Sequence, residues 1–179
     1  VVHSDPKYQS LVDQLNDLNT LPKPDTNQQY NWLLVLNHSQ STLLKSIYLQ
    51  TSDENKQKID SLEQRLSKIL LKNTTAASAQ RSLAFGKKLA EHLLEWSKTD
   101  GGHRGYLENF DPDYEREPFP GSWKPPLFAQ SFSHNPLHHF WGENRTLAPT
   151  NTLLELPEFI PYDPAKGSPY YQEFEAVYK

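Results

Sequence analysis

The 179-residue chain contains no cysteine, no methionine and only seven glycines. The absence of cysteine excludes disulfide bonds, thiolate catalysis and cysteine-ligated zinc, and it fits either a reducing or an export compartment. No run of about 18 apolar residues occurs, so no membrane span is expected. The start, Val1-Val2-His3-Ser4-Asp5, has neither an initiator methionine nor the apolar core of a signal peptide. We therefore expect a chain trimmed from something longer.

The sequence also has no basic tract and a low share of hydrophobic residues. The 18 Lys and Arg residues are outnumbered by 22 Asp and Glu, which gives a net charge of -4, and no basic run of the kind that neutralises phosphates is present. Nucleic acid is therefore not an expected partner. The length suits one domain, but only 36% of the residues are hydrophobic. A full-size core built from this chain alone would be thin.

The first half of the sequence has the periodicity of α-helices. A capping Asp-Pro pair followed by apolar residues at helical spacing predicts a first helix from about 6 to 18. Pro22 and Pro24 interrupt the chain, and Asp25 or Thr26 can cap a second helix. The apolar residues of this second helix spread around much of the cylinder, which indicates a central, mostly buried helix. They are Tyr30, Leu33, Leu34, Leu36, Leu43, Leu44 and Ile47.

Two further helices are predicted before residue 101. Ser52 or Asp53 caps a third, whose narrow apolar stripe and charged opposite face indicate a surface helix. A fourth runs from about 76 to 98, and Gly101-Gly102 stops it because glycine readily takes the left-handed conformation. This fourth helix sets small and apolar residues along one line: Leu83, Gly86, Ala90, Leu93 and Ser97. Glycine and alanine at this spacing let another helix approach closely.

Proline and aromatic residues dominate the second half. Eleven of the 14 prolines lie between Gly101 and Pro169, and 15 of the 21 aromatic residues lie between Gly101 and the C-terminus. Proline excludes long helices and central strands, whereas so many aromatics are atypical of a disordered tail, which is the alternative. We expect an ordered segment that wraps against a surface and buries Trp123 and Trp141. Each fully covered ring would contribute on the order of a few kcal/mol.

The sequence thus predicts an all-α protein, with a bundle of about four to five helices and a long proline- and aromatic-rich wrapping segment. Residues 1–100 form the helical layer, 101–168 the ordered irregular segment and 169–179 the start of a further helix, which Ser168-Pro169 opens. The apolar face of that last helix is incomplete at Lys179. The three parts are therefore expected to form one incomplete domain.

Ten short stretches, spread in order along nearly the whole chain, resemble a known family. They are Tyr8-Gln9-Ser10-Leu11, Gln14-Leu15-Asn16, Leu21-Pro22-Lys23-Pro24, Phe85-Gly86-Lys87-Lys88-Leu89-Ala90, Glu95-Trp96-Ser97-Lys98-Thr99-Asp100-Gly101-Gly102-His103, Tyr106-Leu107-Glu108-Asn109-Phe110, Gly121-Ser122-Trp123-Lys124-Pro125-Pro126, Trp141-Gly142-Glu143-Asn144-Arg145, Tyr162-Asp163-Pro164 and Ser168-Pro169-Tyr170-Tyr171. Together they resemble the amino-terminal helical half of bacterial vanadium-dependent haloperoxidase-like proteins, which belong to the type-2 phosphatidic acid phosphatase superfamily.

The resemblance implies an all-helical protein whose four-helix-bundle core holds vanadate, or phosphate in the phosphatases, with the amino-terminal half packed around that core. It implies a carboxy-terminal catalytic half as partner, either in the same protein or in a companion chain. It also implies a bacterial protein that is exported, periplasmic or associated with the cell envelope.

The family's anion-binding motifs do not occur in this sequence. They are a lysine followed six residues later by Arg-Pro, a Pro-Ser-Gly-His, and a Ser-Arg followed by a distal histidine. Lys166 has no Arg-Pro after it, Ser133-His134 lacks the Pro-Ser-Gly frame, and no Ser-Arg pair occurs. An oxyanion needs several converging donors and a histidine. No catalytic, cofactor-binding or metal-binding residue is therefore assigned in this chain, and vanadate or phosphate is implied only for the complete protein.

A histidine cluster is the strongest candidate for a metal site from the residues themselves. His134 and His138 are four residues apart, and His139 follows directly. If this stretch formed a helix, the first two could bind a metal ion together. Pro136 would then have to lie in the first turn, and no carboxylate follows at a usable spacing. Ordinary loop histidines are the favoured interpretation.

Two charged stretches could likewise form binding sites, but a structural role is favoured for each. Residues 111–117 gather four carboxylates, enough for calcium, but they lack the glycine turn and regular alternation of a calcium loop, which favours a solvated acidic turn. His103-Arg104 could place an imidazole and a cation at a cleft edge. We expect instead that Arg104 satisfies the carbonyls that end the fourth helix.

Two functions from different classes stay open, and the chain alone does not decide whether the protein is an enzyme. In the first, the chain is the non-catalytic helical part of a haloperoxidase or phosphatase and shapes and dries an active cleft in the missing half. The complete protein would then oxidise a halide with hydrogen peroxide, or hydrolyse a phosphoester. In the second, the chain is a stand-alone helical binding or scaffold module that uses its aromatic loop as an interaction surface.

Overall fold

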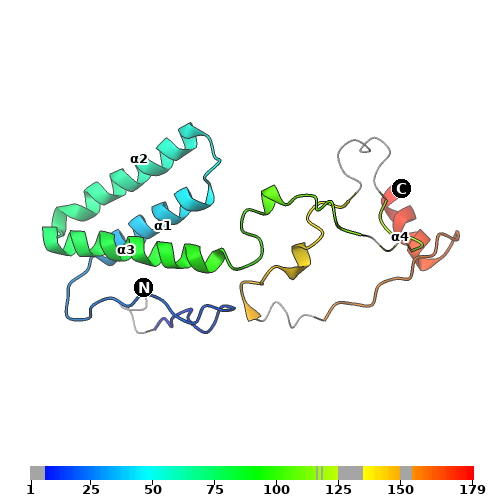
Figure 1. The fold of residues 1–179 in the computed structure, drawn as a ribbon, viewed down its shortest axis with the longest axis horizontal. Coiled ribbons are helices and arrows are strands. Elements are labelled where there is room, and N and C mark those ends of the chain that lie inside the picture. The colour runs from blue at the N-terminus through cyan, green and yellow to red at the C-terminus, as the bar shows by residue number, and fades with distance from the viewer. Residues whose placement is uncertain (1–6, 116, 118, 125–134, 150–154) are drawn as a thin grey trace. The chain divides into compact units, whose positions relative to one another are not determined.

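The computed structural model describes residues 7–115, 117, 119–124, 135–149 and 155–179. Within these residues it contains α-helices and no strand, which confirms the all-α expectation (Figure 1). The helices are α1 (Trp32–Ile47), α2 (Asp53–Leu70), α3 (Ala76–Ser97) and α4 (Pro169–Tyr178). None of them is both long and apolar enough to cross a membrane.

By internal contacts the chain divides into two units. The first comprises residues 1–103 with 145–149 and holds α1, α2 and α3, and the second comprises residues 104–144 with 150–179 and holds α4. The boundaries at 100 and 168 that the sequence suggests stay a prediction.

Three of the helix starts follow from local sequence. Ser52, Thr75 and Ser168 each accept a hydrogen bond from the backbone N–H three residues further on, which fixes the first turns of α2, α3 and α4. Ser52 and Ser168 are the expected caps, and Pro169 occupies the expected first turn. The fourth predicted helix, 76 to 98, matches α3, and Gly101 has the expected positive φ of 92°.

The second predicted helix begins later than the expected cap at Asp25 or Thr26. Asp25 closes a turn instead, since its carboxylate accepts from the Asn27 N–H and its carbonyl accepts from the Gln28 N–H. The cap of α1 is Asn31, whose Oδ1 accepts from the Leu34 N–H at 3.1 Å.

Asn31 also joins all three helices of the first unit. Its Nδ2 donates at 3.2 Å to the carbonyl of Leu70, the last residue of α2, and at 2.8 Å to Thr74 Oγ1 in the connection to α3. Its backbone N–H donates to Ser82 Oγ at 2.9 Å, on α3. Ser82 is fully buried. One residue therefore fixes the start of α1 against the end of α2 and the first half of α3, and we call this contact the Asn31 joint.

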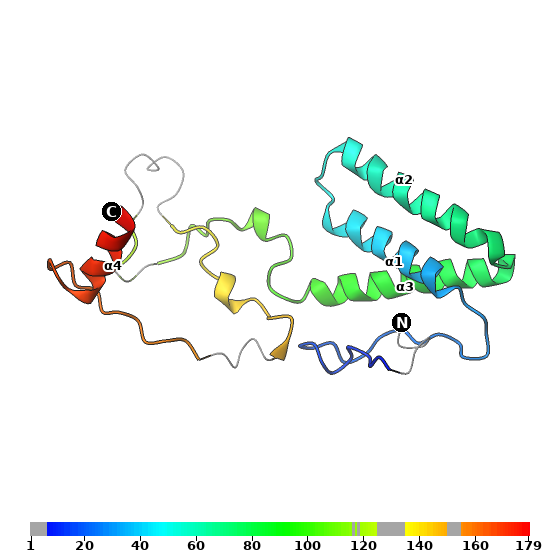
Figure 2. The ribbon, with the colours of Figure 1, turned by 180° about the vertical axis from the view of Figure 1, so that it is seen from behind.

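α1 lies between α2 and α3, as Figure 2 shows from behind, which confirms its predicted central place. The prediction that it is mostly buried is wrong. Leu34 and Val35 belong to the core, but Leu33, Leu36, Leu44 and Ile47 are exposed.

α1 and α3 approach closely because α3 presents small residues to α1. The buried residues of α3 are Ser78, Ala79, Ser82, Gly86 and Ala90. A Cβ at Gly86 would lie 2.7 Å from the Val35 carbonyl oxygen, closer than real contacts allow. The close helix approach predicted from the sequence is confirmed.

The predicted first helix is wrong over its described residues. Residues 7–20 form successive turns, with Asp13 and Asp17 in the left-handed region at φ 61° and 59°. Asn16 is held from far along the chain, since its side chain donates to the Thr146 carbonyl at 2.7 Å and its N–H donates to the Leu147 carbonyl at 3.1 Å. These distant bonds override the local helical pattern.

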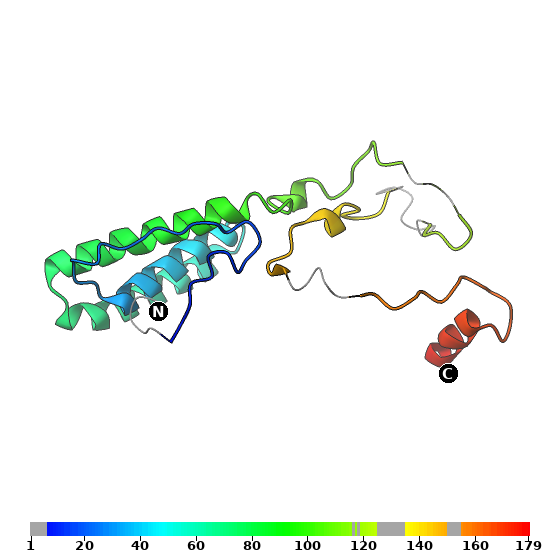
Figure 3. The same ribbon diagram turned by 90° about the horizontal axis from the view of Figure 1, so that it is seen from below.

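The resulting N-terminal segment runs alongside α1 and α3 (Figure 3). The Trp96 indole of α3 donates to the Asn16 carbonyl at 3.1 Å, and the His92 ring bonds the Thr20 carbonyl at 2.9 Å. Leu18 is only 2% exposed and adds a core residue from outside the helices. The first unit therefore consists of three helices and an irregular N-terminal segment that is hydrogen-bonded to α3 along one side.

The aromatic-rich part of the second unit is irregular, with short 3₁₀ turns at Gly105–Leu107 and Trp141–Glu143. The expected burial of Trp123 and Trp141 is wrong, since they are 47% and 67% exposed. The Trp141 ring is approached by the ring of His138, with centroids 5.8 Å apart. Gly121 also meets a ring, because a Cβ there would lie 2.7 Å from Tyr162 Cγ.

We predict that Gly86→Ala lowers the free energy of unfolding by about 1–3 kcal/mol, because the added methyl meets the α1 backbone, which cannot rotate away. The clash would outweigh the roughly 1 kcal/mol by which alanine favours a helix. The measurement is urea unfolding followed by circular dichroism. Lys87→Ala at the neighbouring exposed position is the control and should change stability by less than about 0.5 kcal/mol. An unchanged or more stable Gly86→Ala variant would contradict the close packing.

Candidate functional site

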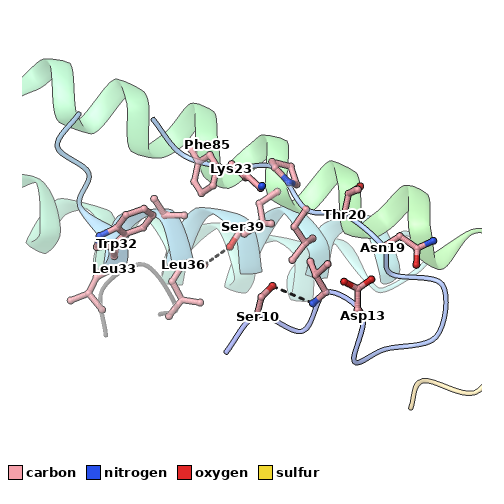
Figure 4. Close-up of a pocket in the computed structure, with 15 residues that line it drawn as sticks. Ser10, Asp13, Asn19, Thr20, Lys23, Trp32, Leu33, Leu36, Ser39 and Phe85 are labelled. Carbon is pink, nitrogen blue, oxygen red and sulfur yellow. Dashed lines mark hydrogen bonds between the residues drawn. The ribbon is translucent and has the colours of Figure 1, made fainter. Parts of the chain in front are cut away.

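The first unit contains an apolar groove of about 680 Å³. Its walls are the N-terminal segment, the first turns of α1 and the middle of α3 (Figure 4). The apolar lining residues are Val12, Leu21, Pro22, Trp32, Leu33, Val35, Leu36, Phe85 and Leu89. Neither the groove nor this lining was anticipated from the sequence, although the broad apolar distribution around the second predicted helix was a signal of it.

Polar groups lie mainly along the groove's edges. Asp13 and Lys23 bring one charge of each sign, and Ser10, Asn19 and Thr20 bring neutral groups. Several of these groups are already bonded, since Ser10 Oγ accepts from the Val12 N–H at 3.2 Å and Ser39 Oγ donates to the Leu36 carbonyl at 3.0 Å. The groove therefore offers apolar contact area, and it has no converging set of charged groups.

A polar cluster joins α1 to α2 around Glu63, a side chain only 14% exposed. His38 Nδ1 lies 2.6 Å from Glu63 Oε1, and the Ser41 hydroxyl donates to Oε2 at 2.6 Å. Lys45 Nζ lies 3.2 Å from Oε2 and 3.0 Å from Asp60 Oδ1. We call these five residues the Glu63 cluster.

Burial would raise the pKa of Glu63, but hydrogen bonds from Ser41, His38 and Lys45 outweigh it, and the pKa falls below its ordinary value of 4.5. Burial would likewise lower the pKa of Lys45, yet its bonds to Asp60 and Glu63 raise it above 10.5. The two charges therefore hold each other ionised across the neutral range.

The Glu63 cluster contains a serine, a histidine and a carboxylate, but it lacks the arrangement that activates a nucleophile. An activated serine donates to a base, and a third group orients that base. Here Ser41 and His38 both bond the same carboxylate. With its pKa lowered, Glu63 is also a poor proton acceptor. The cluster is a structural tie between α1 and α2.

His138 and His139, two of the three candidate metal-binding histidines, lie in a turn and not on a helix. His134 falls outside the described residues, and His138 has a positive φ of 51° in a turn. The His139 side chain is 3% exposed and packs against Tyr114, with ring centroids 4.0 Å apart and ring planes inclined by 32°. Neither ring nitrogen of His139 has a hydrogen-bond partner among the described residues, and Nε2 lies 3.6 Å from Asp111 Oδ2.

The acidic stretch 111–117 begins as a turn, with Asp111 Oδ1 accepting from the Asp113 N–H at 2.9 Å. The Asn135 side chain donates to the Asp111 carbonyl at 2.7 Å, which ties the turn to the histidine stretch. Over the part of the chain that the structure describes, no group of three or more His, Asp or Glu residues is placed to hold a metal ion.

Arg145, and not the expected Arg104, serves the carbonyls that end α3. Its guanidinium donates to the Trp96 carbonyl at 2.8 Å and to Thr99 Oγ1 at 2.9 Å, and it lies over the Trp96 ring at 4.9 Å from the centroid. A further contact reaches Asp17 at 3.4 Å. Arg145 lies 49 residues beyond Trp96 in the sequence. Local spacing could therefore not identify it as the residue that binds the end of α3.

The described residues do not fit an oxyanion such as vanadate. A multiply charged anion needs several cations or amide donors converging on one point. Arg145 is engaged by Trp96, Thr99 and Asp17, and Lys45 by two carboxylates. Lys23 lies on a groove that also carries Asp13. No chemical step through such an anion is derived for this chain.

The helices have a haloperoxidase-like all-helical fold. The likeness is to the crystal structure of the first bacterial vanadium-dependent iodoperoxidase, with a TM-score of 0.69 and 22% sequence identity. It covers 99% of this chain but 40% of the iodoperoxidase chain, so this chain spans about two-fifths of that protein's length. At this identity the likeness shows the fold alone. No protein-family model and no curated protein matches the chain.

We predict that Glu63→Gln lowers the free energy of unfolding at pH 7 by about 2 kcal/mol, because the charge-assisted bonds from Ser41, His38 and Lys45 are weakened. A depressed carboxyl pKa stabilises the fold above the unfolded-state pKa and ceases to do so as pH falls through the folded-state value. The difference between wild type and variant should therefore shrink as pH falls below about 4.5.

The measurement is urea unfolding at a series of pH values. Glu54→Gln is the control, since Glu54 is exposed and pairs with Lys58 on the surface of α2, and it should change stability by no more than about 0.5 kcal/mol at any pH. A Glu63→Gln penalty that stays constant from pH 7 to pH 3 would contradict the charged role of Glu63.

Proposed function

We propose that this chain is the non-catalytic helical layer of a haloperoxidase-like or phosphatidic acid phosphatase-like protein. Its task is to support an active site that binds vanadate or phosphate in a carboxy-terminal half, which belongs to the same protein or to a companion chain. That half would carry out peroxide-dependent halide oxidation, or phosphoester hydrolysis. The observation that carries the proposal is the likeness over 99% of this chain to 40% of a vanadium-dependent iodoperoxidase.

Two features of the chain support this role. The sequence has none of the family's anion-binding motifs, so the chemistry would have to come from elsewhere. The helical layer also exposes apolar surface on α1 and in the groove beside it. Apolar surface of this extent is typical of an interface. A layer packed against a catalytic half would exclude water from the active cleft and hold its walls in place.

A second candidate function is a stand-alone helical binding or scaffold module. The exposure of its aromatic residues favours it, because Phe119, Trp123, Trp141 and Phe159 are all accessible in the second unit. Large exposed rings are enriched in binding surfaces. Location in the periplasm or cell envelope belongs to the first proposal and rests on the family resemblance.

We predict that the chain alone does not bind orthovanadate, whereas the chain together with its carboxy-terminal half does. The measurement is ⁵¹V nuclear magnetic resonance, in which bound vanadate gives a broadened, shifted signal. Iodide oxidation with hydrogen peroxide and hydrolysis of p-nitrophenyl phosphate then separate the haloperoxidase from the phosphatase. Stoichiometric vanadate binding by the chain alone would overturn the non-catalytic role. A complete protein without vanadate binding or either activity would favour the stand-alone module.

A further inference from the structure

The exposed face of α1 carries an apolar stripe. Leu33, Leu36, Leu44 and Ile47 are between 41% and 63% exposed, and Gln40 is the exposed polar residue at the centre. Successive spacings of three, four, four and three residues set these five side chains along one line of the helix. At 1.5 Å per residue the line is about 21 Å long. We call these five residues the α1 stripe.

The other two faces of α1 are already occupied. His38, Ser41 and Lys45 bond the Glu63 carboxylate on α2. Val35 and Ser39 face Gly86 on α3. The stripe therefore faces away from both contacts, and its four apolar side chains stay 41–63% exposed. Four large apolar residues in line are not what a solvated helix face carries.

The α1 stripe is continuous with the groove. Leu33 and Leu36 belong to both, since they are also among the residues that line the groove (Figure 4). The groove adds the indole of Trp32 and the side chains of Phe85 and Leu89 to the apolar surface. The result is one apolar surface that is long in one direction and hollowed at one end.

The shape and spacing of this surface select a helix as its occupant. Apolar residues alternating at three and four positions are the seam that a second helix covers when it packs at about 20°. A strand would need a spacing of two. A small molecule would fill the groove and leave Leu44 and Ile47 uncovered.

A second copy of this chain is a poorer occupant than a segment of a larger partner. The four apolar residues, each less than two-thirds exposed, offer well under the roughly 800 Å² per partner that a stable interface buries. The structural neighbour suggests a larger source, since three-fifths of its length lies outside the part that this chain matches. A partner of that size can bury the stripe as one part of a wider contact.

We propose that the α1 stripe and the adjoining groove bind one amphipathic helix of the carboxy-terminal half. This inference rests on the proposed function and names the contact through which the layer supports the catalytic half. The bound helix presents apolar residues at spacings of three and four to Leu33, Leu36 and Leu44, and its largest side chains enter the groove. The amide of Gln40 meets a polar side chain of that helix and fixes its register.

The absence of cysteine makes a direct test available. Gln40→Cys is labelled with a benzophenone maleimide and irradiated together with the polypeptide that completes the fold, taken from the coding sequence beyond Lys179 or from a companion gene. Gln57→Cys on the exposed surface of α2 is the matched control. Mass spectrometry of tryptic peptides should place the Gln40 cross-links in one helical segment of the carboxy-terminal half. The control should give less than a tenth of that yield.

Cross-links from Gln40→Cys to a second copy of this chain would overturn the proposal, and so would equal yields from both positions. A second measurement uses Leu33→Glu, which should weaken association with the carboxy-terminal half at least tenfold, against Leu62→Glu on α2 as control. Circular dichroism melting confirms that both variants fold. If vanadate binding by the joined halves persists while Gln40 gives no cross-link, only the docking surface fails. If Gln40 cross-links and vanadate does not bind, only the proposed chemistry fails.

Discussion

The arrangement of the helical layer depends on the Asn31 joint. Asn31 caps α1 through the Leu34 N–H, and its side chain donates to the Leu70 carbonyl at the end of α2 and to Thr74 in the following connection. Its own N–H bonds Ser82 on α3. The helix ends that meet there carry orphan backbone groups, which cost free energy if buried without partners. One amide side chain satisfies backbone groups of α1 and α2, and the backbone N–H of the same residue bonds α3.

The joint matters because the apolar core of this layer is small. Among the residues of this layer that the structure describes, the buried hydrophobic ones are Leu18, Leu34, Val35, Ala79 and Ala90. Core packing alone therefore does little to fix the positions of the helices. The Glu63 cluster holds α1 against α2, and the close backbone contact at Gly86 holds α1 against α3. The apolar residues missing from the core are on the outside, on the α1 stripe and along the groove, where a partner can cover them.

Local signals were sufficient to predict much of the fold, and distant contacts account for the errors. Ser52 and Ser168 cap helices with groups three residues away, so their helices were predictable from sequence. The turns at residues 7–20 depend on bonds from Asn16 to a segment 130 residues away. Burial at Trp123 was predicted wrongly because ring content says nothing about what covers a ring. In the same way, the groove and the Glu63 cluster exist only once α1, α2 and α3 are packed.

Hydrogen exchange of the Asn31→Ala variant, read by mass spectrometry against Asn31→Ser, tests the account most directly. Serine keeps the cap acceptor but is too short to reach the Leu70 carbonyl, whereas alanine keeps neither. If the joint holds the layer together, Asn31→Ala should lose amide protection in α1, in the last turns of α2 and in the facing part of α3 together. Asn31→Ser should retain protection in the first turn of α1. Loss confined to that first turn in Asn31→Ala would contradict the account.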